Sequence, residues 1–290
     1  MLVLILLIAL FPSVIEQFTD LTNNEEDPNW KSSLQVEIDA NKEAIKEDPE
    51  EKEYYEERIA LAEYRIANNL KPDNGQTTES YVGYGVSLIT VISFFAVIVG
   101  ASIVSNEFST GTIKMLLTRP VSRVKILTSK LLTVFLYGIV LYIAALFLCY
   151  IVGVVVYDGS TDPTLAYENG KVIEKSFIAD AAYTGLLYLA DFVMTILFAF
   201  MIGSVFRSSS LAIGLTLIIS FMTALVVGFF SRYEFVKYIW ITHSDLTQHK
   251  TGMYLVEGIT MQMSLIVLGV YAVIFTAISY LVFMKRDITA

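Results

Sequence analysis

The sequence predicts an all-α membrane protein: a six-helix transmembrane bundle with an extracellular helical hairpin insert and an interfacial helix at the cytoplasmic surface. Hydrophobic residues make up 55% of the 290 residues, and the mean hydropathy is +0.60, which exceeds what a soluble domain of this size usually carries. These residues fall in runs long enough to cross a bilayer. Most acidic residues gather in one segment between the first two runs.

Five hydrophobic runs reach the length of roughly 20 residues that a transmembrane helix needs. They are Tyr81–Ser105, Leu131–Tyr157, Ala181–Phe206, Leu211–Ser231 and Ile259–Met284. A sixth run, Met1–Ile15, is shorter and has no basic residue before it, so it is either a clipped span or the core of a signal peptide. We favour a span because no small-residue cleavage site follows. Six spans also place both termini on one side, as the basic pair Lys285-Arg286 favours.

Basic residues in the short loops predict orientation, since cytoplasmic loops carry an excess of Lys and Arg. The loops assigned to the cytoplasm contain Lys114, Arg119, Arg123, Lys125, Lys130, Arg207, Lys285 and Arg286. Segment 106–130 and the tail 285–290 are therefore cytoplasmic. Segments 158–180 and 232–258 hold few basic residues for their combined length and become extracellular loops. We expect a multi-pass protein of a bacterial cell membrane with cytoplasmic N- and C-termini.

Segment 16–80 is the acidic part of a chain whose formal net charge is −9. An extracellular position suits it, because negative charge there does not meet the anionic cytoplasmic leaflet. Two stretches show helical spacing: Leu34, Ile38, Asn41 and Ile45, then Tyr55, Ile59, Ala62, Ile66 and Leu70. Between them Asp48-Pro49-Glu50-Glu51 has the pattern of a helix start. The segment predicts a helical hairpin that serves as a substrate vestibule or docking surface; the alternative is a solvated, partly disordered loop.

Segment 106–130 is too polar to span the membrane and too hydrophobic for a free loop. Three apolar side chains share one helical face: Ile113, Leu116 and Leu117. This pattern predicts a short helix that lies flat on the membrane surface. Pro120 ends that helix, and Ser122 can cap a new one that continues into the third span. The two helices would form a rigid elbow, because no glycine-rich linker separates them from the span.

The runs Glu107–Lys114 and Leu116–Arg123 resemble the loop after the second span in ABC-2 type transporter permeases, and Phe283–Ile288 resembles the C-terminus of that family. Members usually begin with a cytoplasmic amphipathic helix before the first span, whereas this chain starts inside that span. The resemblance implies a coupling helix that sits in a groove of a cytoplasmic ABC ATPase. The coupling residues would be Glu107, Phe108, Gly111, Thr112, Lys114, Leu117, Pro120 and Arg123. For any single one of these, ordinary capping or loop charge is the alternative.

The sequence contains no Gly-x-x-x-x-Gly-Lys-Ser/Thr phosphate loop. We therefore expect no enzyme activity, no catalytic residue and no cofactor on this chain, with ATP and Mg held by a separate ATPase. The single cysteine, Cys149, can form neither an intramolecular disulfide nor a cysteine zinc site. No kinase or nucleic-acid module is present, so we expect no nucleic-acid partner.

Asp191 is the intramembrane polar candidate, because a carboxylate within a span costs about 2.5–3.5 kcal/mol and usually faces a bundle interior or water. The alternative is a structural hydrogen bond to a neighbouring helix or a place near the outer headgroups. His243, Asp245 and His249 have a spacing that could offer metal ligands. We interpret them as loop polarity and predict no metal site, since a third firm ligand is missing.

These features favour the permease subunit of an ATP-driven ABC exporter, which moves an amphipathic peptide, an antibiotic or a lipid-like substrate outward. The resemblance implies a dimer of two permease copies, a homodimer or a heterodimer, with two ATPase subunits. The alternative is a membrane sensor or assembly factor whose extracellular insert binds a peptide or an envelope component. An ATPase that is encoded nearby and co-purifies with the chain would favour the exporter.

Overall fold

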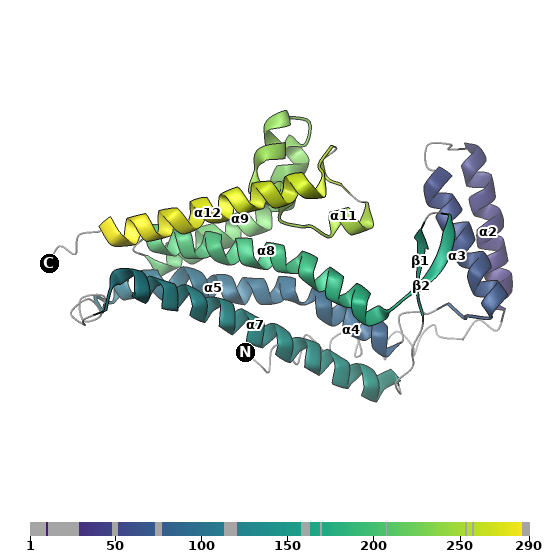
Figure 1. The fold of residues 1–290 in the computed structure, drawn as a ribbon, viewed down its shortest axis with the longest axis horizontal. Helices are drawn as coiled ribbons and strands as arrows, with labels where there is room; N and C mark the ends of the chain where they lie inside the picture. The colour runs from purple at the N-terminus through teal and green to yellow at the C-terminus, as the bar shows by residue number, and fades with distance from the viewer. Residues whose placement is uncertain are drawn as a thin grey trace. The chain divides into compact units, whose positions relative to one another are not determined.

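The computed structural model describes residues 10, 29–47, 52–72, 77–112, 121–157, 163–168, 170–206, 208–252, 254–256 and 258–285. These residues are mostly helical (Figure 1). The described residues divide into two compact units. We call the first, within Met1–Val86 and Ala145–Tyr183, the insert unit, and the second, within Ser87–Ala144 and Thr184–Ala290, the bundle unit.

The elements are α2 (Trp30–Glu47), α3 (Lys52–Asn68), α4 (Thr78–Ser87), α5 (Ile89–Ser109), α7 (Arg123–Tyr157), β1 (Thr164–Glu168), β2 (Lys171–Lys175), α8 (Phe177–Val205), α9 (Ser209–Phe230), η2 (Glu234–Tyr238), α10 (Trp240–His243), α11 (Gln248–Thr251) and α12 (Met261–Lys285). Helices α7 and α8 contribute residues to both units.

In the insert unit, α2 and α3 lie side by side (Figure 1). Leu34 and Ile38 of α2 and Ala62 of α3 are buried between them. The Arg58 guanidinium donates two hydrogen bonds to Glu37 Oε1, from Nε at 3.1 Å and from Nη2 at 2.5 Å. The two acidic helices therefore bury one apolar stripe each, and the charged residues remain on their outer faces.

The strands β1 and β2 form an antiparallel hairpin within segment 158–180, for which the sequence analysis predicted a loop. Gly170, between the strands, has φ +77, a left-handed conformation that tight hairpin turns require and that glycine adopts without steric cost. The Tyr64 hydroxyl of α3 donates a hydrogen bond to Glu174 Oε1 of β2 at 3.2 Å. This bond holds the hairpin against the helices of the insert unit.

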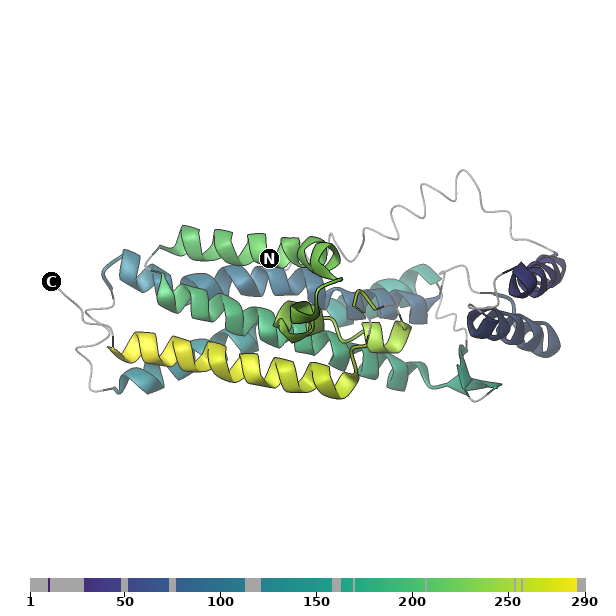
Figure 2. The ribbon, with the colours of Figure 1, turned by 90° about the horizontal axis from the view of Figure 1, so that it is seen from above.

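The bundle unit consists of long apolar helices that run alongside one another, and Figure 2 shows α5, α8, α9 and α12 in this arrangement. One buried cluster joins α5, α8 and α9 through Val97, Ala101, Ala199 and Ala212. A second cluster joins α8, α10 and α12 through Phe198, Trp240 and Phe275. Small side chains allow close helix approach in the first cluster, and aromatic rings fill the second.

Four helical stretches in the described chain are long and apolar enough to cross a membrane: Thr78–Ser109, Arg123–Tyr157, Phe177–Val205 and Met261–Lys285. They correspond to the predicted spans 81–105, 131–157, 181–206 and 259–284. The predicted span 211–231 corresponds to α9, in which the described apolar stretch Ser209–Met222 is shorter. The predicted first span, 1–15, lies outside the described residues apart from residue 10.

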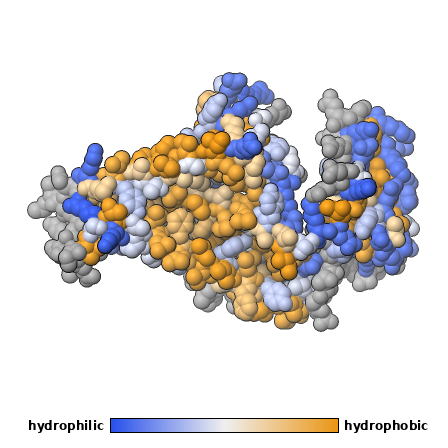
Figure 3. All heavy atoms as spheres, in the orientation of Figure 1, coloured by the Kyte–Doolittle hydropathy of each residue, from blue (hydrophilic) through white to orange (hydrophobic). Residues whose placement is uncertain are grey.

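The outer faces of these helices are apolar. Figure 3 shows hydrophobic residues over much of the visible face of the long helices, and hydrophilic residues over α2 and α3. Exposed apolar side chains of the bundle unit include Leu136 and Val140 of α7, Phe221 and Leu225 of α9, and Ile266 and Val273 of α12. Soluble monomers rarely expose apolar surface on this scale, whereas a lipid environment matches it.

Candidate functional site

The ends of α5 and α12 and the beginning of α7 meet in the bundle unit. We call their contacting residues the helix-end cluster: Glu107, Phe108, Arg123, Lys130, Phe283 and Met284. Lys130 Nζ lies 2.5 Å from Glu107 Oε1 and also donates to the carbonyl oxygen of Ile103 at 2.9 Å. The Lys130 and Glu107 side chains are only 13% and 21% exposed. Removal of one partner would therefore leave the other charge poorly solvated.

Arg123 connects α7 to α12. Its Nη1 donates a hydrogen bond to the Met284 carbonyl oxygen at 3.0 Å. This bond satisfies one of the last carbonyl groups of α12 and places a positive charge at the negative end of the helix dipole. Phe108 of α5 packs edge to face on Phe283 of α12, with 6.2 Å between ring centroids. An ion pair, a charged hydrogen bond and an aromatic contact thus fasten three helix ends together.

Five of the eight predicted coupling residues lie in the described chain: Glu107, Phe108, Gly111, Thr112 and Arg123. The other three lie outside it, together with the predicted interfacial helix: Lys114, Leu117 and Pro120. Gly111 has φ +73, a left-handed conformation that ends α5, and it is exposed together with Thr112. The structure brings Glu107, Phe108 and Arg123 into the helix-end cluster and places Gly111 and Thr112 just beyond it along the chain.

Asp191 of α8 lines a pocket of about 110 Å³ in the bundle unit, which we call the Asp191 pocket. Its other lining residues are Thr90, Ser93 and Phe94 of α5, Thr195 of α8, Ser220 of α9, Trp240 of α10, and Ser244. Asp191 Oδ1 lies 3.5 Å from Thr195 Oγ1, and Ser244 lines the same pocket while its hydroxyl group donates to the Ile241 carbonyl oxygen at 3.1 Å. Asp191 therefore has a hydrogen bond within its own helix and borders open space.

The two histidines converge on one serine hydroxyl. Ser264 Oγ lies 2.9 Å from His243 Nδ1 and 2.9 Å from His249 Nε2. His243 Nε2 lies 2.8 Å from the Lys237 carbonyl oxygen, so this nitrogen carries the hydrogen and Nδ1 accepts from Ser264. Burial lowers the pKa of both imidazoles. Asp245 accepts hydrogen bonds from the residue two positions further on.

The histidine arrangement is a hydrogen-bonded cluster and does not have the composition of a metal centre. Both nitrogens of His243 are engaged, and its side chain is fully buried. Across the residues that the structure describes, no group of three or more His, Cys, Asp or Glu side chains could hold a metal ion. What this arrangement can do chemically is hold two neutral imidazoles in fixed orientations.

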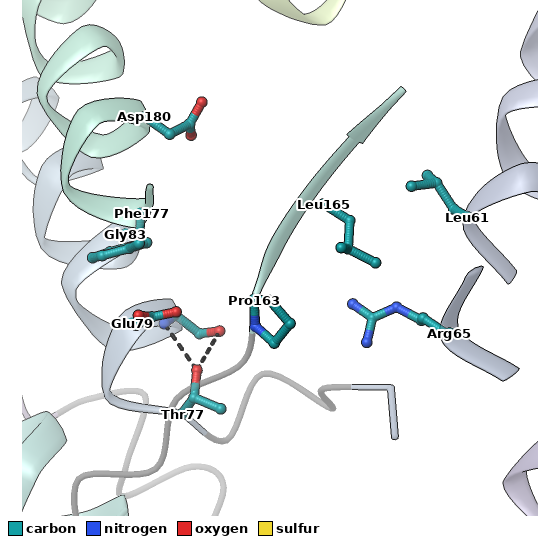
Figure 4. A pocket seen from close by; sticks show the side chains of 10 residues that line it. Leu61, Arg65, Thr77, Glu79, Gly83, Pro163, Leu165, Phe177 and Asp180 are labelled. Carbon is teal, nitrogen blue, oxygen red and sulfur yellow. Dashed lines mark hydrogen bonds between the residues drawn. The ribbon is translucent and has the colours of Figure 1, made fainter. Parts of the chain in front are cut away.

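The insert unit contains a larger pocket, of about 380 Å³, which we call the insert pocket (Figure 4). It is lined by Leu61, Arg65, Thr77, Glu79, Ser80, Gly83, Pro163, Leu165, Phe177 and Asp180. Leu61 and Arg65 of α3 lie on the opposite side from Glu79 of α4 and Asp180 of α8 (Figure 4). The pocket therefore combines a basic group, two acidic groups and apolar side chains.

Several members of these sites carry no signal in the sequence. Lys130 counted only as a loop charge, Ser244 and Trp240 as parts of an extracellular loop, and Ser264 as one residue of a span. Residues that meet in these sites lie far apart along the chain; Arg123 and the Met284 carbonyl group, for example, are 161 positions apart. Only folding brings such groups together.

Residues 68–289 match the family described as "Protein of unknown function (DUF2705)". The chain is 37% identical over 269 residues to the uncharacterized protein YhcI of Bacillus subtilis (strain 168), across 91% of this chain and 86% of that protein. It is 29% identical over 218 residues to the uncharacterized membrane protein YdbK of the same organism, across 73% of this chain and 85% of that protein. No solved structure matches the chain. The description of YdbK as a membrane protein agrees with the apolar helices of this chain.

Proposed function

This chain belongs to the DUF2705 family, and we propose that it is the membrane-spanning permease subunit of an ATP-driven ABC exporter. In this proposal the protein crosses the bacterial cell membrane several times, with both termini in the cytoplasm. Two permease copies enclose the path, and two cytoplasmic ABC ATPase subunits bind ATP and Mg. The permease supplies the path and carries out no chemical reaction.

The helix-end cluster is the observation that carries this proposal. The chain between α5 and α7 has the residues that resemble an ATPase-contacting loop, and both of its ends are fastened. Glu107 and Lys130 link α5 to α7, and Arg123 links α7 to α12. A force on this loop would therefore be transmitted to three helices, because the contacts at its two ends connect α5, α7 and α12.

A transport step follows from this arrangement. Closure of the two ATPases on ATP would press on segment 106–130 and displace the ends of α5, α7 and α12 together. Packed helices respond to such a displacement by rigid-body tilting or shear rather than by gradual bending. Tilting in both permease copies would open the path outward for an amphipathic peptide, an antibiotic or a lipid-like molecule.

The ion pair of the helix-end cluster provides the test. We expect Glu107→Gln and Lys130→Gln each to lower the substrate-stimulated ATP hydrolysis of the co-purified complex by about fivefold or more, within the range of typical coupling free energies. Lys125→Gln is the matched control, because it removes the same charge from an exposed position of the same helix. The swap Glu107→Lys with Lys130→Glu should restore part of the stimulation.

Two results would contradict the proposal. The first is that no nucleotide hydrolase co-purifies with the wild-type chain. The second concerns orientation and uses Thr112→Cys, because Thr112 is exposed whereas the native Cys149 is buried. A membrane-impermeant maleimide should modify this cysteine in inside-out vesicles and not in intact cells, and the opposite pattern would place the loop outside.

The insert pocket favours a second candidate function, a membrane sensor or assembly factor. Arg65 could pair with a carboxylate of a peptide, while Glu79 and Asp180 could pair with its basic groups. A sensor would respond to the ligand in this pocket without coupling to ATP hydrolysis. Loss of the response in a pocket-filling variant of a chain that has no ATPase partner would support this candidate.

A further inference from the structure

The residues that line the Asp191 pocket favour a positively charged ligand over a negatively charged one. One carboxylate, the hydroxyl groups of Ser93, Thr195 and Ser244, and the ring of Trp240 line it. No Lys or Arg is among the described residues that line this pocket. An anion would meet the Asp191 carboxylate without a compensating positive charge, whereas a cation would be attracted by it.

The hydroxyl groups can act as acceptors toward such a cation. Ser93 Oγ donates its hydrogen to the Ile89 carbonyl oxygen at 2.9 Å, which leaves its lone pairs for another donor. An ammonium group has only donors to offer, so carboxylate and hydroxyl oxygens complement it. Asp191 Oδ1 and Thr195 Oγ1, 3.5 Å apart, could both accept from one such group.

The aromatic side chains add a fixed π surface. Trp240 packs against Phe198 and Phe275, with ring centroids 5.4 and 5.7 Å away, and Phe94 stacks on Phe221 at 4.8 Å. Rings held in this way can present a face to an ammonium group, and such cation–π contacts strengthen when water is excluded. The volume of about 110 Å³ is several times the share of one water molecule in the liquid, so an ammonium head with a few carbon atoms fits.

From this combination we propose that the Asp191 pocket binds an ammonium group, held by the Asp191 carboxylate and the Trp240 ring. The assignment of this group to the exported cargo rests on the proposed exporter function and narrows its cargo to cationic amphipathic molecules. Binding of the ammonium group requires only this chain. A test without the ATPase therefore separates failure of the pocket from failure of the exporter.

Trp240 offers a built-in probe, because the chain has two tryptophans and Trp30 lies in the insert unit. The Trp30→Phe chain, purified in a non-ionic detergent, is titrated with n-hexylammonium while Trp240 fluorescence is recorded. We expect a saturable change that n-hexanol does not produce. Asp191→Asn should weaken apparent affinity by about tenfold or more, the loss expected when a charged hydrogen bond is replaced by a neutral one. Asp191→Glu, which keeps the negative charge, should retain most of the affinity for n-hexylammonium.

Equal responses to hexylammonium and hexanol, or equal affinities of the Asn and Asp chains, would overturn the proposal, since either result indicates simple partitioning of the hydrocarbon tail. Folding of each variant is checked by its thermal midpoint. The source of the ammonium group is tested in phosphatidylglycerol nanodiscs with and without phosphatidylethanolamine. Competition by phosphatidylethanolamine supports an ammonium site that accepts a lipid headgroup, and undiminished hexylammonium binding supports one that selects a soluble amine.

Discussion

At the scale of single residues, Ser264 fixes the protonation of both histidines. Its hydroxyl group can donate only one hydrogen bond, and His243 Nδ1 receives it because His243 Nε2 donates to the Lys237 carbonyl oxygen. His249 must then donate from Nε2 to the Ser264 oxygen. A proton added to His243 would compete with the Ser264 hydrogen at Nδ1, so the arrangement favours a neutral His243 ring.

This cluster predicts how stability depends on pH. Burial lowers the pKa of His243 and His249 below the ordinary value of about 6.5, so the unfolded chain takes up protons first as the pH falls. The stability that neutral imidazoles contribute is therefore complete above about pH 6.5 and is lost progressively below it. We expect the thermal midpoint of the detergent-solubilised chain to be constant near neutral pH and to decline below about pH 6.5.

Substitutions of the two histidines provide the controls, since His243 and His249 are the only histidines in the sequence. His243→Gln should flatten the decline, even if the variant is less stable at every pH. His249→Gln should flatten it less, because His249 is only partly buried whereas His243 is fully buried. An unchanged slope in the double variant would assign the pH dependence to other groups.

At the scale of elements, the contact between α5 and α8 depends on the absence of a side chain. A Cβ atom added at Gly203 of α8 would collide with the carbonyl oxygen of Ala101 of α5 and would lie 2.9 Å from its carbonyl carbon. Backbone atoms of a packed helix cannot move aside as a flexible side chain can. The two helices would have to separate.

We therefore expect Gly203→Ala to destabilise the folded chain by about 1–3 kcal/mol, the usual cost of overpacking, despite the higher helix propensity of alanine. Gly214→Ala on α9 is the matched control, because in the described part of the chain no atom beyond its own helix backbone and chain neighbours lies within 4 Å of the Cβ position there. It should be neutral or stabilise by up to about 1 kcal/mol. Denaturant or thermal unfolding of both variants in detergent measures the difference, and shifts in the same direction would show that the α5–α8 contact does not limit stability.

Hydrophobic run lengths and helical periodicity predicted most of the long helices, because both patterns are local. The β-hairpin also has a local signal that the sequence analysis overlooked: the dipeptide Asn169-Gly170 stands between two strand-like runs, a strong hairpin pattern. The exact ends of the helices were harder to predict. Helix α5 continues to Ser109, beyond the predicted end of the span at Ser105, because a helix can continue beyond the apolar part of its sequence. Helix α7 begins at Arg123, as the predicted cap at Ser122 indicated, and Ser122 Oγ accepts a hydrogen bond from the Lys125 amide at 3.4 Å.

The candidate sites were predictable only in part. Glu107 and Arg123 stood out through the resemblance to permease loops, and Asp191 stood out because a charge inside an apolar run is costly. Their partners did not stand out, since Lys130, the Met284 carbonyl group and Ser244 are ordinary parts of their segments until the fold brings them into the same sites. Sequence patterns therefore indicated one member of each site, and the structure supplied the other.

At the scale of the whole molecule, each unit contains the site on which one of the two proposed functions rests. The bundle unit has the helix-end cluster and the Asp191 pocket, on which the exporter proposal rests, and the insert unit has the insert pocket, on which the sensor candidate rests. A substitution at Gly83 distinguishes the two proposed functions. Gly83 of α4 lines the insert pocket, and among the described residues no atom beyond its own helix backbone and chain neighbours lies within 4 Å of a Cβ atom placed there. Gly83→Leu would thus extend a side chain into the pocket without a clash at Cβ, and leucine also favours a helix.

If the chain is an exporter, Gly83→Leu should leave substrate-stimulated ATP hydrolysis within about twofold of wild type, as for a substitution away from the coupling contacts. Lys130→Gln, measured in parallel, should lower it. Gly83→Ala serves as the control for helix propensity, because it adds a methyl group and leaves most of the pocket open. A sensor would show the reverse, a response lost in Gly83→Leu and retained in Lys130→Gln. Because the two functions predict opposite results for the same pair of variants, the comparison decides whether the protein works through the helix-end cluster or through the insert pocket.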